Sequence, residues 1–319
     1  MQSETQTATA LRDRSTRLFR GLQDLITSSL EAVDGKQAFQ EDTWRHQQGG
    51  GGITRILQNG CLFEKAGVST SVVSGALSDL LAGRLNTEAK EFYATGISLV
   101  LHPHSPMIPT VHMNLRYIEL SSGDAWFGGG ADLTPYYLFE DDARHFHSTL
   151  KNICDKHSRE YYPHFKKWCD EYFFLKHRGE ARGIGGIFFD YVRDDLESFF
   201  LFVEDLGNTF LDIYLPIVEH RRKEPYGERE KNWQLVRRGR YVEFNLLHDR
   251  GTLFGLETGG RTESILMSLP PEVRWVYNYQ SPLGSREEKL LTVLCHPKEW
   301  ANDQTSALDS EPQSFRHPS

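Results

Sequence analysis

The stretch Thr110–Tyr117 combines residue types and a spacing that suit an acidic ligand. Side chains of a β-strand alternate between two faces, so His112, Asn114 and Arg116 share one face and the apolar residues that alternate with them share the other. A proton-transfer group, an amide and a fixed cation side by side can bind and protonate an anion. The same pattern also fits a solvated sheet face on which Arg116 forms a structural ion pair, so both interpretations stay open.

Histidines near this stretch are candidates for metal ligation. His102 and His112 end or begin neighbouring expected strands, and His145, His147 and His177 follow later in the chain. Imidazole suits several first-row metals. No HExxH motif and no closely spaced carboxylate accompanies these residues, and a histidine also serves as a buried hydrogen-bonding group or as a donor to substrate.

Glycines precede two charged candidates. Asp132 follows Gly128–Gly130, where missing side chains let a ligand approach the backbone closely. Its carboxylate can instead cap the turn that follows. Arg261 follows Gly259–Gly260, whose backbone N–H groups can bind a carboxylate beside the guanidinium. A desolvated arginine–carboxylate pair of this kind contributes ~1.5–3 kcal/mol.

Asp249 and Arg250 lie between two expected strands, on a hairpin connection of the kind where binding sites are commonly built. Upstream, residues 221–240 carry eight basic and three acidic side chains, a local charge of +5 in a chain of −8. Such a run is usually a solvated surface, but a concentrated positive patch in an acidic protein can attract a small polyanion.

The composition narrows the class of protein. Of 319 residues, 39% are hydrophobic and 25% charged, which is typical of a globular chain rather than a disordered one. The charge of −8 disfavours nucleic-acid binding, and no apolar run approaches the ~18 residues of a membrane span. Four scattered cysteines without CxxC spacing suit a reducing compartment. Because no signal-peptide pattern starts the chain, we expect a cytoplasmic protein.

Periodicity predicts the elements that must position these residues. Helical spacing predicts helices over residues 18–33 and 196–217. The glycine run 49–52 is expected to be a loop, without the Gly-Lys-Ser/Thr of a P-loop. Glycines at 183–186 precede a strand rather than a helix, the reverse of a dinucleotide fingerprint. The expected strands are Gly96–Leu101, Thr110–Glu119, Ile187–Phe189, Arg240–Leu247, Thr252–Leu256 and Ser264–Leu269.

This mixture predicts an α/β fold of the α+β type, in which helices pack on an antiparallel sheet. No internal repeat or linker divides the chain between residues 10 and 300. We therefore expect one domain over residues 1–301 and a polar C-terminal tail over residues 302–319.

Seven blocks of the sequence carry a resemblance to a known family. They are residues 49–57, 63–68, 98–116, 126–136, 168–190, 216–234 and 237–271. These blocks closely resemble the oxygen-dependent coproporphyrinogen III oxidases, and the resemblance extends from about residue 10 to 300. The segment GRYVEFNLLHDRGTLFGLETGGRTESILMSLPP is most similar to the bacterial branch of that family.

The resemblance implies a single domain with a large antiparallel sheet flanked by helices on both faces, assembled as a homodimer. It also implies oxidative decarboxylation of two propionates of coproporphyrinogen III to vinyls. The products would be protoporphyrinogen IX, CO2 and hydrogen peroxide. The family works without flavin, haem or nicotinamide, so O2 is expected as a co-substrate and no organic cofactor is expected.

The resemblance also implies site residues, position by position. His112 matches the proton donor. Asp249, beside Arg250, matches a position proposed to meet the pyrrole N–H groups, and Asp132 matches another implicated acid. The positions that match the family's carboxylate-binding residues are Ser98, Asn114, Leu115, Arg116, Gly259, Gly260 and Arg261.

Members of the family differ in their metal content. Bacterial relatives are described with a divalent ion at positions that match His102, His112, His147 and His177, whereas other members are described as metal-free. The reaction needs no Lewis acid, so we favour no metal. A ligating imidazole at position 112 also could not readily donate the expected proton.

Two other functions stay open. One is a histidine-metal oxygenase or hydrolase built on those four histidines. The other is a non-enzymatic carrier that binds a porphyrin or another anion in the same basic pocket. No nucleic-acid partner and no transmembrane segment are expected.

Overall fold

The structure, a computed structural model, describes residues 2–46, 49–257 and 260–301. The expected tail, residues 302–319, and the candidate Gly259 lie outside the described residues. Within the described part of the chain, no helix has both the length and the apolar character needed to cross a membrane.

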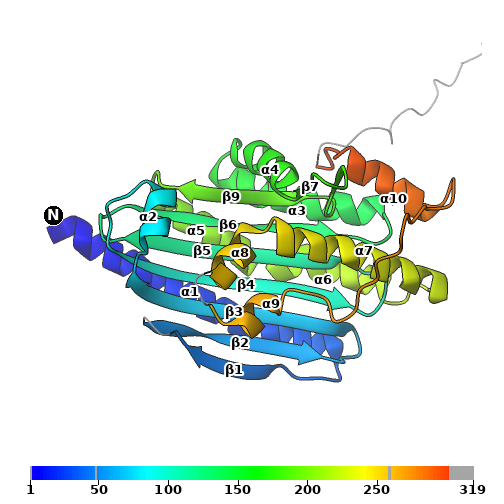
Figure 1. The fold of residues 1–319 in the computed structure, drawn as a ribbon, viewed down its shortest axis with the longest axis horizontal. Coiled ribbons are helices and arrows are strands. Elements are labelled where there is room, and N and C mark those ends of the chain that lie inside the picture. The colour runs from blue at the N-terminus through cyan, green and yellow to red at the C-terminus, as the bar shows by residue number, and fades with distance from the viewer. Residues whose placement is uncertain (1, 47–48, 258–259, 302–319) are drawn as a thin grey trace, which may run out of the picture.

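A seven-stranded antiparallel sheet forms the centre of the molecule, in the order β1-β2-β3-β4-β5-β6-β9 (Figure 1). Its strands are β1 (Gln40–Arg45), β2 (Gly50–Gln58), β3 (Phe63–Ala76), β4 (Glu91–Pro103), β5 (Thr110–Leu120), β6 (Ala125–Thr134) and β9 (Gly186–Val192). A separate two-stranded ribbon consists of β7 (Phe174–Leu175) and β8 (Glu180–Ala181).

Helices cover both faces of this sheet, which confirms the predicted fold class (Figure 1). The helices behind the sheet in that view are α1 (Gln2–Asp34), α3 (Glu140–His157), α5 (Leu196–Asn208) and α6 (Phe210–Arg221). Those in front of it are α7 (Glu228–Leu247), α8 (Arg250–Glu257) and α9 (Thr262–Leu266). The others are α2 (Asp79–Leu85), α4 (Tyr161–Tyr172), which packs beside β9, and α10 (Arg286–Cys295).

The main hydrophobic core lies between the sheet and the rear helices. Val111, Met113 and Leu115 of β5 are completely buried there, and each such side chain contributes about 1.5–3 kcal/mol on burial. Because side chains alternate, the polar residues of β5 lie on the opposite, front face, as predicted. The core therefore determines which side of the sheet carries the candidate site.

The three strands expected after residue 239 are wrong. Arg240–Leu247 is the last part of helix α7, Thr252–Leu256 lies in α8, and Ser264–Leu269 contains the end of α9. Along α7 the buried residues include Trp233, Arg237, Tyr241 and Phe244, which is helical spacing. A buried arginine at one of these positions breaks the apolar pattern, so the aromatic and branched residues after it resemble a strand.

Two further expectations, a loop over residues 49–52 and a continuous helix over residues 196–217, are wrong. Gly50–Gly52 belong to β2 rather than to a loop. A Cβ on Gly52 would lie 2.5 Å from the Trp44 ring of β1, so a side chain there would displace the tryptophan. The helix expected over residues 196–217 is interrupted at Thr209, between α5 and α6.

Candidate functional site

His112 and Asp132 form a cross-strand pair on the front face of the sheet. They are direct partners in the β5–β6 register, and His112 Nδ1 lies 2.7 Å from Asp132 Oδ1. Arg182 Nη2 donates to both carboxylate oxygens, at 2.9 and 2.7 Å. An ionised carboxylate only accepts, so His112 carries its hydrogen on Nδ1. No described residue bonds to Nε2, which is the ring nitrogen available to a ligand.

The neighbours of Asp132 keep its carboxylate ionised. Burial alone would raise the pKa of Asp132, but the charge of Arg182 and the hydrogen bond from His112 outweigh burial and lower it. Arg182 also donates to Asn245 Oδ1 at 2.8 Å. Its guanidinium carbon lies 4.1, 4.6 and 4.8 Å from the ring centroids of Phe173, Tyr241 and Phe244. Because Asp132 lies inside β6, the interpretation as a turn cap is wrong.

Asn114 and Arg116 form a second group on the same face. Arg116 Nη1 donates to Asn114 Oδ1 at 2.9 Å, and Arg116 Nη2 lies 2.8 Å from Asp190 Oδ2 on β9. Ser98 is the register partner of Asn114 on β4, so its side chain shares this face. Arg116 therefore does form an intrachain ion pair, yet 29% of its side chain stays exposed.

Leu115 differs from the other expected binding residues. Its side chain is completely buried in the core behind the sheet, because alternation places it opposite Asn114 and Arg116. Only its backbone can border the front face.

Asp249 begins helix α8 rather than a hairpin turn. Its Oδ2 accepts hydrogen bonds from the N–H and the hydroxyl of Thr252, both at 2.8 Å, as in an N-cap. Its Oδ1 accepts from the Tyr172 hydroxyl at 2.9 Å, and burial and the Asp249 charge raise the pKa of Tyr172 to about 12. The Arg250 guanidinium lies 4.9 Å from the centre of the Tyr172 ring.

An aromatic cluster connects Asp249 with His112. Tyr172 stacks on Phe188 of β9, with ring centroids 4.2 Å apart. Phe188 in turn contacts Phe173, whose ring centroid lies 6.1 Å from that of His112. The two groups expected to act on the substrate are therefore linked through one buried aromatic cluster.

Arg261 lies at the opposite side of the front face. It precedes α9 and pairs with Asp42 of β1. A hydrogen bond of 2.8 Å between the hydroxyls of Thr54 and Ser264 holds α9 against the sheet. The Gly260 N–H donates to the Gly255 carbonyl at 2.8 Å, so this amide is used within the connection between α8 and α9.

The candidate residues extend across most of the sheet. Arg116 is on β5 and the partner of Arg261 is on β1, four strands away. At about 4.8 Å between neighbouring strands, these strands lie about 19 Å apart. Cations near two strands this far apart suit a large ligand that carries carboxylates on opposite sides of its rim.

The four histidines that were candidates for a metal do not fit one site. His102 is buried, with Nδ1 3.1 Å from Thr110 Oγ1 and Nε2 2.9 Å from the Ser268 carbonyl. His147 is also buried, and both its ring nitrogens are within 3.0 Å of partners. His177 lies on the surface, 2.8 Å from Glu243. Within the described ranges, no three His, Cys, Asp or Glu side chains are grouped as a ligand set.

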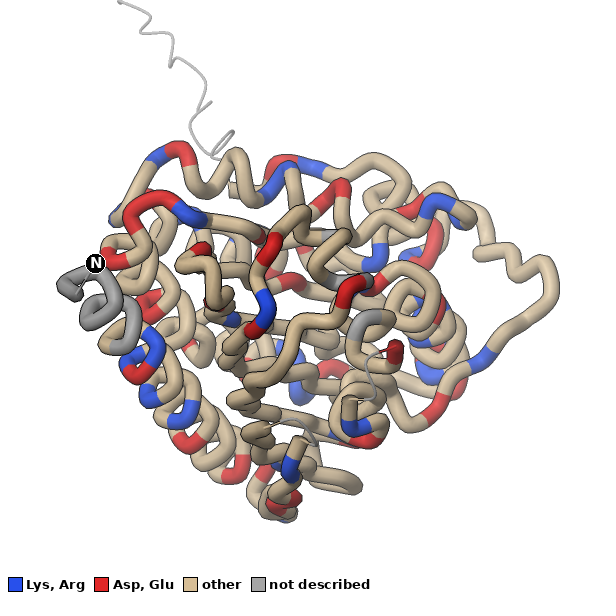
Figure 2. The backbone as a smooth tube through the Cα atoms, turned by 60° about the vertical axis from the view of Figure 1, so that its left-hand side comes forward, with Lys and Arg blue, Asp and Glu red and all other residues tan. Residues whose placement is uncertain are grey.

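The basic stretch 221–240 is largely neutralised by intrachain ion pairs, which disfavours the alternative that it attracts a polyanion. The pairs are Arg221–Asp142 at 2.8 Å, Arg229–Glu287 at 2.8 Å, Arg237–Glu180 at 2.6 Å and Arg238–Glu64 at 2.7 Å. Figure 2 shows basic and acidic residues interspersed over the chain.

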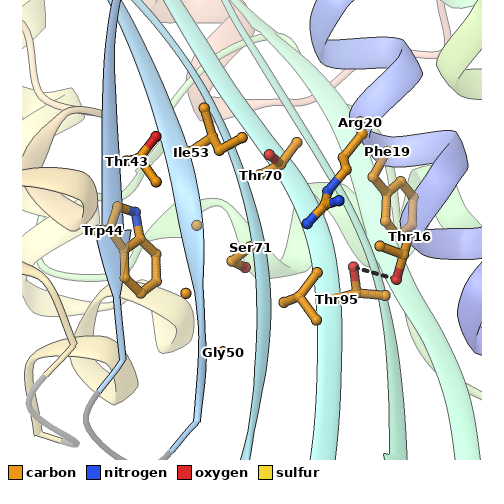
Figure 3. A pocket seen from close by; sticks show the side chains of 13 residues that line it. Thr16, Phe19, Arg20, Thr43, Trp44, Gly50, Ile53, Thr70, Ser71 and Thr95 are labelled. Carbon is orange, nitrogen blue, oxygen red and sulfur yellow. Dashed lines mark hydrogen bonds between the residues drawn. The ribbon is translucent and has the colours of Figure 1, made fainter.

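A cavity of about 340 Å³ lies between α1 and strands β1–β4 (Figure 3). Thr16, Phe19 and Arg20 of α1 close it on one side. Thr70, which lines it, donates a 3.0 Å hydrogen bond to the Gln23 side chain of α1, so this cavity belongs to the rear face, which α1 covers. It contains none of the candidate site residues.

Comparison with known proteins identifies the family. The family model described as coproporphyrinogen III oxidase matches residues 14–300. The chain belongs to the coproporphyrinogen III oxidase family. It is also 50% identical over 313 residues to an oxygen-dependent coproporphyrinogen-III oxidase, chloroplastic, from Glycine max, a match that covers 93% of this chain and 81% of that protein. Whether the chain is closer to the bacterial branch of the family stays a prediction.

Three residues that hold the candidate site residues in place were not predicted from the sequence: Arg182, Tyr172 and Asp190. Arg182 is 50 positions from Asp132, and Tyr172 is 77 positions from Asp249. Asp190 directly follows the strand that was expected over Ile187–Phe189 and lies inside the observed strand β9. A polar residue directly after an apolar strand was a signal for Asp190, whereas the partners of Arg182 and Tyr172 follow only from the fold.

Proposed function

We propose that this protein catalyses the oxygen-dependent oxidative decarboxylation of coproporphyrinogen III to protoporphyrinogen IX in haem biosynthesis. The match of the family model over residues 14–300 carries this proposal. The front face supports it, because it combines an oriented imidazole with widely separated arginines. Such a set suits a macrocycle that carries four propionates.

The chemistry balances with O2 as the only oxidant. In the net reaction, each of two propionate side chains loses its carboxyl group as CO2. It also loses one hydrogen, together with the electron pair of that C–H bond, from the carbon next to the ring, and so becomes a vinyl group. Each O2 takes up these two electrons and two protons and leaves as hydrogen peroxide. The macrocycle passes these electrons to O2 and is itself unchanged at the end, so the chain's own residues need only bind, orient and move protons.

Each candidate site residue has a role in this reaction that follows from its position. Asp249 accepts or removes a pyrrole N–H hydrogen and so raises the electron density of the ring. O2 then adds to the ring, and the resulting peroxide removes the proton of the propionate carbon as CO2 leaves. His112 delivers a proton to the departing peroxide from Nε2, while Asp132 stabilises the charged imidazole through Nδ1. Asn114 and Arg116 hold one carboxylate and Arg261 another.

We further propose that no metal or organic cofactor takes part and that the enzyme is a homodimer in the cytoplasm. The ring nitrogens of His102 and His147 already have protein partners, which supports the absence of a metal. The Glycine max relative is named as chloroplastic, so localisation needs its own test. Cell fractionation and light scattering of the purified protein check the compartment and the mass.

Aerobic incubation with freshly reduced coproporphyrinogen III tests the activity. Products are oxidised and separated by chromatography, beside anaerobic and chelator-treated samples. We expect a three-propionate intermediate and then protoporphyrin, only with O2 and also with chelator. Activity lost on chelation would favour the histidine-metal enzyme instead. Saturable binding without product would favour a tetrapyrrole carrier and would refute the proposed activity.

A further inference from the structure

Both arginines assigned to the substrate are already paired with carboxylates of their own chain. Arg116 contacts Asp190, and Arg261 contacts Asp42. Each pair joins one residue on the front face to a strand at or near an edge of the sheet. A substrate propionate must therefore either share the arginine with the aspartate or replace it.

The geometry at Arg116 is the better defined of the two. Asp190 Oδ2 lies 2.8 Å from Arg116 Nη2, and the two side chains are 9% and 29% exposed, respectively. A Cβ on Gly128 would lie 2.6 Å from Asp190 Oδ1 and 2.8 Å from Arg116 Nε and Nη2. The first glycine of the Gly128–Gly130 run thus leaves the space that this ion pair occupies on the sheet.

Asp190 has a second partner that does not involve the arginine. Its Oδ1 accepts the backbone N–H of Tyr191 at 3.0 Å. The carboxylate thus keeps a hydrogen bond when Arg116 leaves. Arg116 is the more exposed member and keeps its bond to Asn114, so it can turn toward a ligand while Asp190 stays in place.

We propose that Asp190 is a placeholder carboxylate, which occupies Arg116 in the absence of substrate and is exchanged for a substrate propionate on binding. This inference rests on the proposed function, since it assumes that Arg116 binds a propionate. Two carboxylates at one guanidinium repel each other, so exchange is favoured over sharing. Asp190 therefore limits the affinity for the tetra-acid and makes Arg116 selective for ligands that can displace it.

Binding of coproporphyrin III, the oxidised form that keeps all four propionates, tests this exchange. Its Kd is measured by fluorescence for the wild-type protein, Asp190→Asn and Arg116→Ala. Asp124→Asn is the matched control, because Asp124 also pairs with an arginine, Arg193, at 2.9 Å and its removal deletes the same charge without touching Arg116. Circular dichroism of each variant confirms its fold.

We expect Asp190→Asn to bind coproporphyrin III about two- to five-fold more tightly than wild type does. This factor corresponds to the strength of a partly exposed ion pair. Asp124→Asn should bind like wild type. Weaker or unchanged binding by Asp190→Asn overturns the placeholder, and so does equal tightening in both variants. Unchanged binding by Arg116→Ala would instead overturn the proposed substrate contact. Misfolding of the Asp190→Asn variant would also overturn the placeholder, because a placeholder is not required for folding.

Discussion

Single hydrogen bonds determine what the candidate catalytic groups can do. Because Asp132 accepts from His112 Nδ1, the imidazole presents Nε2 to the front face. Arg182 makes this arrangement stable, since it neutralises Asp132 inside the protein. His112 was predicted from its strand pattern, but the role of Asp132 as its partner required the register between β5 and β6.

Arg182→Met should destabilise the protein. The Arg182 and Asp132 side chains are only 2% and 3% exposed, so the substitution removes the guanidinium that neutralises a buried carboxylate and leaves it with His112 alone. We expect the free energy of unfolding to fall by about 3–5 kcal/mol, measured by urea denaturation. Arg193→Met is the control, because its ion pair is exposed and should contribute less than about 1 kcal/mol. Equal losses in the two variants would contradict the assigned role of Arg182.

Arg261→Ala should weaken substrate binding. The variant loses a charged hydrogen-bond donor for a propionate, which is worth about 1.5–3 kcal/mol. Titration with coproporphyrin III measures the expected rise in Kd. A Kd equal to that of wild type would remove Arg261 from the binding site.

At the scale of elements, a glycine in one strand leaves room for charged side chains of the neighbouring strands to pack against it. Gly128 of β6 lies directly under the Arg116–Asp190 pair. Gly128→Ala should push the two side chains apart and change the KM for coproporphyrinogen III at least two-fold, with little effect on the fold. Gly21→Ala in α1 is the control, because a Cβ there meets no atom within 4 Å. Steady-state kinetics that are identical for wild type and Gly128→Ala would show that this spacing is not needed.

Elements with regular periodicity could be predicted from the sequence, and those with buried charge could not. β5 and its two faces follow from simple alternation. Helix α7 was missed because Arg237 and Arg238 are buried in ion pairs with Glu180 and Glu64, which no local pattern reveals. Three strands were therefore predicted in the region of α7–α9, and Asp249 was placed on a hairpin connection rather than at the N-cap of α8.

For the molecule as a whole, buried histidines predict acid sensitivity. Burial, with the nearby charge of Lys166, lowers the pKa of His147 to about 3, and burial and Arg238 also lower the pKa of His102. In the unfolded chain both titrate near pH 6.5. Below that pH the unfolded state binds protons that the folded state does not, so stability falls as the pH falls toward 3.

The decrease in the free energy of unfolding should approach about 1.4 kcal/mol per histidine for each pH unit below 6.5. Urea unfolding at pH 7.5 and 5.5 measures it. His147→Gln should show a smaller difference between the two pH values than wild type does. If both proteins lost the same stability, His147 would not contribute to the acid sensitivity.

The most direct test of the proposed reaction site compares turnover and binding in His112→Ala. Loss of a general acid should lower the kcat for coproporphyrinogen III about 10²–10⁴-fold under air. The Kd for coproporphyrin III should stay close to that of wild type, because the arginines that hold the carboxylates are unchanged. Wild-type turnover in this variant would contradict the assignment of the reaction to His112 on the front face of the sheet.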